Sequence, residues 1–172
     1  MKKMFWKLLV IVNVLLVGAY QALAGTTEMT IDPYNQYDKP KEMESSFKKY
    51  YCIDTGLLSS KKTTTTGDFG RMLENAVAIE LKRKGHELYY YMVDDKYAVD
   101  FVIAEMGTIR EVIQVVNDDE EIPEREIRTG ILACNRLKCK KLKIITWNKA
   151  YGISQEGIDV EYIPLWKFLT MR

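Results

Sequence analysis

The apolar positions of the chain follow a helical period in one long segment and gather in several shorter runs of strand length. Between residues 68 and 84 apolar side chains recur at helical spacing, and Gly85 follows as a residue that readily takes the left-handed conformation at a helix end. Segments at 87–93, 97–104 and 108–116 are short runs rich in apolar, β-branched and aromatic residues and are separated by short turns. The pattern predicts a helix followed by a meander of three strands.

The remaining elements are shorter and flank this central block. A second helix is expected after the three strands, with Pro123 near its first turn, where a missing backbone N–H costs nothing. The predicted ranges are a strand at 50–53, a helix at 121–137, strands at 141–147 and 158–163, and a short helix after Pro164. This order predicts an α/β (α+β) fold with a mixed central sheet and flanking helices.

Three polar side chains interrupt otherwise apolar faces of these elements. On the first helix, Glu74 has apolar residues three, four and seven positions later, so its carboxylate lies on the side that is expected to be buried. By alternation, Asp100 is expected to share a strand face with Ala98 and Val102, and Gln114 also lies within an apolar row. Buried carboxylates require a partner group or a metal ion, so these three residues are the candidate site.

The same residues carry a resemblance to a known superfamily. A helix with Glu, a strand with Asp and a strand with a Glu/Gln-x-Lys pattern, in this order, resemble the PD-(D/E)xK nuclease-like superfamily. More narrowly, residues 48–172 resemble the uncharacterised C-terminal domain that follows the ATPase module in many bacterial and archaeal AAA-type ATPases. The motifs that carry the resemblance are Tyr50-Tyr-Cys-Ile-Asp-Thr-Gly-Leu57, the segment 70–81, Gly85-His-Glu-Leu-Tyr-Tyr-Tyr91, Val99-Asp-Phe-Val102 and Ile113-Gln-Val115. The resemblance implies a restriction-endonuclease-like αβββαβ core.

The resemblance also implies roles for the polar residues. It assigns Asp100 and Gln114 to coordination of Mg²⁺ and Glu74 to the helix carboxylate of a catalytic site, and it places the catalytic lysine at position 116. That position holds Val116, which can neither bind water nor offset negative charge. Gln114 is neutral and binds Mg²⁺ less well than a carboxylate. The implied site is therefore a remnant that binds Mg²⁺ weakly, if it binds the ion at all.

Three interpretations of this remnant remain open at the sequence level. The residues form a hydrogen-bonded polar knot without chemistry, or they bind a metal or phosphate without turnover. Alternatively, a lysine from elsewhere, such as Lys82 or Lys96, restores the missing charge and with it a metal-dependent phosphodiesterase or endonuclease.

Charge and composition restrict the partners. The formal net charge is +1, so any contact with nucleic acid must be local. The basic candidates for such contact are Lys82, Arg83, Lys84, Lys138, Lys140 and Lys141, and Tyr89 to Tyr91 are candidates for stacking on bases. Lysines at a helix end and tyrosines in a strand also have ordinary roles in solubility and packing. The three cysteines have no spacing typical of a zinc site or a disulfide framework, which favours free thiols.

The N-terminus points to a different cellular context from the rest of the chain. Residues 1–24 combine a basic start, an apolar run and a small-x-small ending, which is typical of a secretory signal peptide, an uncleaved membrane anchor or a hydrophobic helix. Residues 25–47 lack a sustained period and are expected to be a linker to the domain at 48–172. The family resemblance favours the cytoplasm instead, so the localisation stays open.

Three functional hypotheses follow. The first is a degenerate nuclease-like domain that acts as a binding or regulatory module with an ATPase module or another protein partner. The second is an active Mg²⁺-dependent DNA endonuclease with a relocated lysine. The third is an exported interaction protein that reuses the fold. The chain has no phosphate-binding G-x-x-x-x-G-K-S/T loop, so ATP hydrolysis would belong to a partner.

Overall fold

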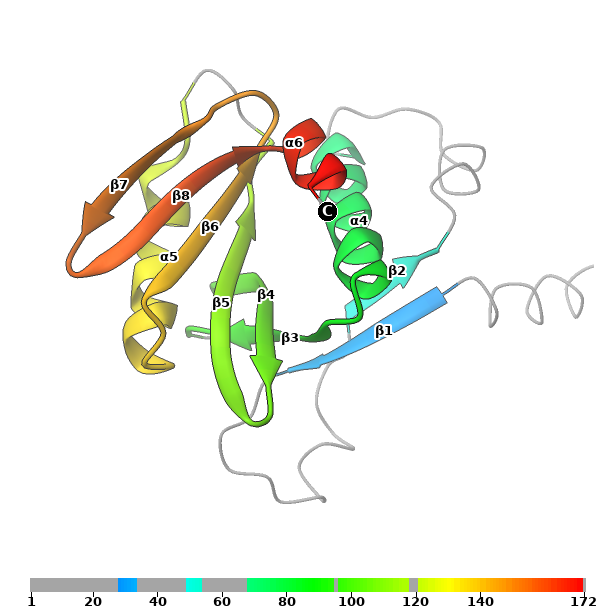
Figure 1. Ribbon diagram of the computed structural model, residues 1–172, viewed down its shortest axis with the longest axis horizontal. Coiled ribbons are helices and arrows are strands. Elements are labelled where there is room, and N and C mark those ends of the chain that lie inside the picture. Colours follow the sequence, from blue (N-terminus) through cyan, green and yellow to red (C-terminus); the bar gives the residue numbers. More distant parts are fainter. Residues whose placement is uncertain (1–27, 34–48, 54–67, 95, 118–120, 172) are drawn as a thin grey trace, which may run out of the picture.

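The computed structural model describes residues 28–33, 49–53, 68–94, 96–117 and 121–171. These residues form a mixed sheet with helices packed against it (Figure 1). The strands are β1 (Glu28–Pro33), β2 (Lys49–Cys52), β3 (Glu87–Met92), β4 (Ala98–Glu105), β5 (Thr108–Val115), β6 (Lys141–Thr146), β7 (Tyr151–Gln155) and β8 (Ile158–Pro164). The helices are α4 (Asp68–Arg83), α5 (Glu124–Arg136) and α6 (Leu165–Thr170).

The strand order across the sheet is β2-β1-β3-β4-β5-β6-β8-β7. Strands β3, β4 and β5 form the predicted antiparallel meander, whereas β6 and β8 continue the sheet in parallel with β5. Helix α5 makes the crossover from β5 to β6. The mixed sheet, the flanking helices and the αβββαβ order of elements are therefore confirmed.

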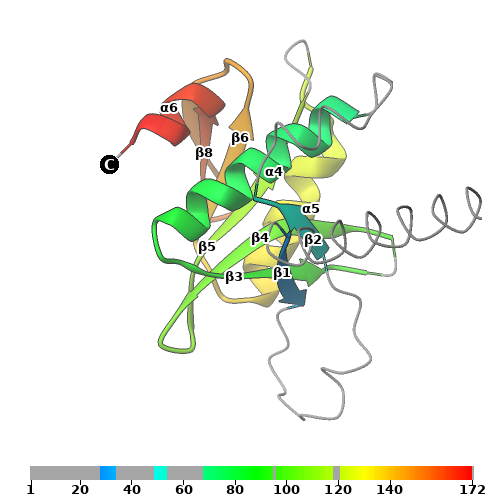
Figure 2. The same cartoon turned by 90° about the vertical axis from the view of Figure 1, so that its right-hand side faces the viewer.

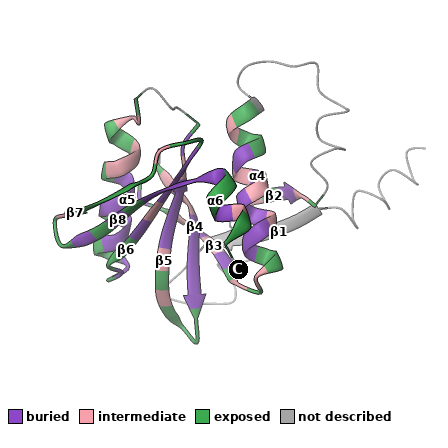
Figure 3. Ribbon diagram, turned by 45° about the horizontal axis from the view of Figure 1, so that its top comes forward, coloured by how far each residue is buried: buried purple, intermediate pink, exposed green. Residues whose placement is uncertain are grey.

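Two apolar cores lie on the two faces of the sheet. Helices α4 and α6 cover one face and α5 covers the other (Figure 2). Along much of β3 to β6 and β8, successive residues alternate between the two cores, and Figure 3 shows buried residues in purple along the sheet and on parts of the helices. The α4 face buries Phe101, Ile113, Ile145 and Ile163, and the α5 face buries Val102, Val112, Ile144 and Tyr162.

The helix boundaries agree closely with the sequence pattern. Helix α4 ends as predicted before Gly85, whose φ is +81° and whose neighbour His86 donates its backbone N–H to the Leu81 carbonyl at 3.2 Å. Helix α5 begins three residues later than predicted, because Pro123 is its N-cap residue rather than part of its first turn. Residues Ile131 and Cys134 face the sheet as expected.

Two strands were not predicted. Strand β1 lies within the segment expected to be a linker, 25–47, and pairs with both β2 and β3, so the linker prediction is wrong for residues 28–33. Strand β7 was missed because Tyr151–Gln155 is short and largely exposed, and its two apolar residues, Tyr151 and Ile153, give only a brief alternation. Pairing with neighbouring strands therefore gives these segments their structure without a strong local signal.

The prediction for residues 1–24 lies outside the described residues. Within the described part of the chain, no helix is long and apolar enough to cross a membrane. The cysteines are free thiols, as predicted, with Cys134 and Cys139 buried and Cys52 half-buried.

Candidate functional site

A β-bulge in β4 decides where Asp100 points. Strand β3 pairs Tyr89 with Val102 and then Tyr91 with Val99. Two residues of β4, Asp100 and Phe101, therefore lie opposite the single residue Tyr90. The extra residue interrupts the alternation of side chains at this point. Asp100 therefore lies on the α4 face beside Phe101, and not on the face of Val102 as alternation had predicted.

Helix α4 brings Glu74 toward Asp100. The helical period predicted that Glu74 would face the core, and its side chain is 24% exposed. One carboxylate oxygen of Glu74 accepts the Tyr51 hydroxyl at 2.6 Å, from the neighbouring strand β2. The ring of Tyr51 packs against Phe101 with 5.6 Å between centroids, so β2, α4 and β4 meet at one point.

Lys49, at the start of β2, joins the two carboxylates. Its ammonium Nζ lies 3.0 Å from Oε1 of Glu74 and 3.1 Å from Oδ1 of Asp100. The same ammonium lies over the ring of Tyr90, 5.7 Å from the centroid. The side chains of Lys49 and Asp100 are only 28% and 14% exposed, so the ion pairs are partly shielded from water. One cation of the protein itself therefore bridges both acids.

The titration behaviour of these groups follows from this geometry. Burial, together with the nearby charge of Glu74, raises the pKa of Asp100 from 3.8 to about 6, although Lys49 pulls it down. Burial lowers the pKa of Lys49, but attraction to Asp100 and Glu74 outweighs burial and the net shift is upward. Burial and the Glu74 carboxylate also raise the pKa of Tyr51. Lys49 is therefore protonated at neutral pH.

Asn75 holds β2 in place against α4. Its side-chain oxygen accepts the backbone N–H of Cys52 at 2.8 Å, and its amide nitrogen donates to the Cys52 carbonyl at 2.8 Å. Asn75 is buried, so these bonds are protected from competition with water. The two bonds fix the position of the strand that carries Lys49 and Tyr51.

Gln114 does not join this cluster. It lies on the α5 face with Val112 and Val116, where its amide nitrogen donates to Glu126 at 2.7 Å. The side-chain oxygen of Gln114 accepts the backbone N–H of Asp100 at 3.3 Å. Gln114 therefore contacts the backbone of β4 and not the carboxylates of Glu74 and Asp100. The expectation that all three polar side chains converge is therefore wrong for Gln114, because the bulge moves Asp100 to the opposite face.

The position implied for a catalytic lysine also lies on the α5 face, away from the carboxylates of Glu74 and Asp100. Val116 is 5% exposed and belongs to the apolar core under α5. The backbone N–H of Val115 donates to Oδ2 of Asp100 at 2.9 Å. The backbone pairing between β4 and β5 ends at Phe101 and Ile113. At the next residues, the bonds of Asp100 with Gln114 and Val115 join a side chain to the backbone and take its place.

Sequence reasoning missed Lys49 as a site residue. The lysines considered as substitutes, Lys82 and Lys96, are exposed and are not bonded to either carboxylate in the described structure. The predicted strand began one residue too late, at Tyr50. Alternation along β2 places Lys49 and Tyr51 on one face, and this was the available signal.

The residues of the cluster do not fit a magnesium ion well. Mg²⁺ prefers octahedral coordination by oxygen atoms, usually from carboxylates and water. Among the described residues, the cluster holds two carboxylates, Glu74 and Asp100, which already share a lysine, and Gln114 points away. Within the described ranges, no three His, Cys, Asp or Glu side chains are grouped to hold a metal ion.

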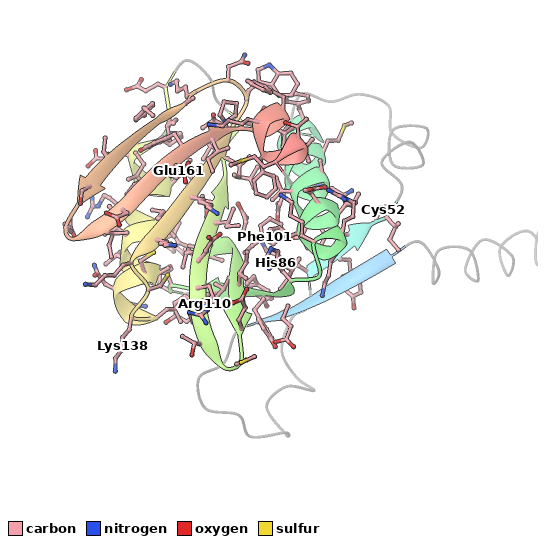
Figure 4. All side chains as sticks on the ribbon, viewed as in Figure 1. Cys52, His86, Phe101, Arg110, Lys138 and Glu161 are labelled. Carbon is pink, nitrogen blue, oxygen red and sulfur yellow. The ribbon has the colours of Figure 1, made fainter. Side chains whose placement is uncertain are left out.

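The predicted nucleic-acid residues do not form a single surface. Lys82, Arg83 and Lys84 end α4, whereas Lys138, Lys140 and Lys141 follow α5 on the opposite face of the sheet, where Figure 4 shows Lys138 at the lower left. Arg83 and Lys84 pair with Glu80 at 2.8 and 3.4 Å. Lys84 also donates to the Phe168 carbonyl at 3.4 Å, which ties α4 to α6.

The tyrosine run is likewise used for packing. Tyr90 is buried in the core under α4, and Tyr89 and Tyr91 pack against the core under α5. The three rings therefore do not form one continuous stacking surface.

Comparisons with known proteins identify relatives without a described function. The chain is 36% identical over 134 residues to the uncharacterised protein MJ1544 of Methanocaldococcus jannaschii, in a match that covers 72% of this chain and 29% of that protein. It is 32% identical over 133 residues to an uncharacterised protein of Haemophilus influenzae, covering 76% of this chain and 32% of the relative. The chain thus spans about a third of the length of these relatives. No family model and no solved structure matches it.

Proposed function

We propose that this chain carries a nuclease-like domain that does not cleave nucleic acid and acts as a binding or regulatory module, in association with an ATPase module. The observation that supports this proposal is the position of Lys49. Its ammonium lies within 3.1 Å of both carboxylates, Glu74 and Asp100, on which a metal-dependent site would depend.

A divalent cation would have to displace this ammonium from a partly buried position. In a nuclease, the ion activates water and a separate lysine stabilises charge in the transition state. Here the two acids already share a single lysine, and the position of the usual lysine holds the buried Val116. The cluster therefore stabilises the junction of β2, α4 and β4, while the arrangement for cleavage is incomplete.

The link to an ATPase rests on the family resemblance and on the length of the relatives. The match covers 29% and 32% of the two relatives, which is the relation expected between a domain and a multidomain protein. The printed sequence has no phosphate-binding loop, so the ATPase activity would come from a separate module.

Nicking of supercoiled plasmid DNA by the full chain tests the proposal. We expect the same low level of nicking with Mg²⁺, with EDTA and with the Asp100→Ala variant. Mg²⁺-dependent nicking that Asp100→Ala abolishes would overturn the proposal.

One observation favours a second candidate, an active Mg²⁺-dependent endonuclease with a relocated lysine. Lys49 is a lysine from another strand that reaches both acids, as that mechanism requires. If this candidate is correct, Lys49→Ala and Asp100→Ala both remove Mg²⁺-dependent nicking, whereas Lys96→Ala, at an exposed turn, leaves it unchanged.

A further inference from the structure

Among the described strands, β7 is an open edge of the sheet, with a neighbour on one side only. It lies at the opposite end of the strand order from β2 and pairs with β8 (Figure 1). Natural edge strands usually carry a lysine, a proline or a bulge that discourages a further strand from pairing. Strand β7 reads Tyr-Gly-Ile-Ser-Gln, without charge or proline, and its register with β8 runs without a shift. It therefore lacks the common features that protect an edge.

The backbone of β7 offers hydrogen bonds at two positions. The β7–β8 hairpin closes through Glu156 and Gly157, whose φ angles are +52° and +74°, as in a two-residue turn. The residues that flank such a turn exchange both backbone bonds, and every second residue then turns its N–H and C=O to the other side. By this alternation, Gly152 and Ser154 direct their backbone groups to the open edge.

The two sides of this edge differ in chemistry. On one face of the sheet, Gly152 lies beside Glu161 and Ser154 lies beside Asp159. Neither of these exposed carboxylates has an ion pair among the described residues. Figure 4 shows Glu161 on β8. The neighbouring Lys143 pairs instead with Glu111 at 2.7 Å.

The other side of the edge is apolar. Tyr151 is 47% exposed and Ile153 is 42% exposed. The ring of Tyr151 stacks on Tyr162, with 4.0 Å between centroids, so it continues the apolar surface of the α5 face.

We propose that β7 binds an extended segment of a partner protein in which basic residues alternate with apolar ones. A long basic side chain opposite Gly152 or Ser154 would cross that small residue and reach Glu161 or Asp159. The apolar residues of the same segment would cover Tyr151 and Ile153, and backbone bonds would extend the sheet. The inference does not depend on whether the proposed nuclease-like function is correct.

Strand β6, on the other side of β8, already places alternate lysines beside the same two carboxylates. Strand β6 begins Lys-Leu-Lys-Ile, and it places Lys141 beside Asp159 and Lys143 beside Glu161. A second copy of this chain fits less well, because its own β7 has no charged residue to pair with the two carboxylates across the open edge.

Binding of a model peptide tests the inference. An acetylated six-residue peptide that alternates lysine and isoleucine is titrated into the ¹⁵N-labelled full chain, and a peptide with glutamate in place of lysine is the matched control. We expect the lysine peptide to shift the amide signals of Gly152 and Ser154 and to slow their hydrogen exchange. Binding of the glutamate peptide should be at least about fivefold weaker, as expected for the loss of two exposed ion pairs.

Variants separate the contributions of charge and backbone. The double variant Asp159→Asn, Glu161→Gln should bind the lysine peptide about fivefold more weakly than the wild type at low salt. At high salt the two proteins should bind it about equally. Ser154→Pro should abolish binding by removing an outward N–H, while Ser154→Ala should bind normally. The inference is overturned if neither peptide binds at millimolar concentration or if both bind equally. Dimerisation of the free chain that Ser154→Pro abolishes would also overturn it.

Discussion

At the scale of single residues, the decisive contact is the one between Lys49 and two acids. Glu74 and Asp100 repel each other in a partly buried position, and the ammonium between them offsets part of that cost. The Tyr51 hydroxyl adds a hydrogen bond to Glu74. The cluster therefore has a structural role that is independent of any chemistry.

Replacing Lys49 by methionine should destabilise the fold. The methionine keeps most of the length of the side chain but leaves two partly buried carboxylates without a cation, so we expect a loss of about 2 kcal/mol in the free energy of unfolding at neutral pH. Urea denaturation measures it. Lys96→Met is the control, since Lys96 is exposed, and it should change the stability little. A Lys49→Met protein as stable as the wild type would show that the cluster is not stabilising.

The raised pKa of Asp100 gives a pH dependence of defined sign. Because the folded protein binds this proton more tightly than the unfolded chain, the contribution of Asp100 to stability falls as the pH rises from 3.8 to about 6 and is constant above. Carboxyl ¹³C NMR of Asp100 should show a midpoint near 6. The stability of wild type relative to Asp100→Asn should decrease over the same range. A midpoint near the ordinary value of 3.8 would contradict the described burial.

At the scale of elements, the docking of β2 on α4 determines whether Lys49 reaches the acids. Asn75 makes two bonds to the backbone of Cys52 and is buried. Asn75→Ala should therefore cost about 2 kcal/mol of stability, or about 1 kcal/mol for each bond lost.

Hydrogen exchange shows whether this loss is local. In Asn75→Ala the amide of Cys52 should exchange faster than in wild type, while amides in β6 should keep their relative protection. Asn135→Ala, on the exposed side of α5, is the matched control and should not change either region. Unchanged exchange at Cys52 would mean that Asn75 does not hold the strand.

Most elements could be predicted from the sequence because they have a strong local period. Helix α4 buries one side, so apolar residues recur along it at helical spacing, and the strands of the meander are short, largely apolar segments bounded by turns. The bulge in β4 has no such signal, since it depends on pairing with β3, and it alone reverses the expected relation between Asp100 and Gln114. Glu74 and Asp100 were predicted correctly as neighbours, but Lys49 could be found only once β2 was known to pack on α4.

At the scale of the whole molecule, the sheet separates two environments. The α4 face holds the cluster of Lys49, Glu74 and Asp100, whereas the α5 face holds Gln114 and Val116. The residues to which the family resemblance assigns one catalytic site are thus divided between two faces. The same sheet leaves β7 open at its far edge, away from the cluster.

Binding of Mn²⁺, a paramagnetic substitute for Mg²⁺, tests most directly whether Lys49 takes the place of a metal ion. Mn²⁺ is titrated into the ¹⁵N-labelled full chain, and the broadening of each amide signal is measured. The account predicts no selective broadening near Asp100 and Val115 at millimolar Mn²⁺. Selective broadening of these amides at submillimolar Mn²⁺, lost in Asp100→Asn, would contradict it.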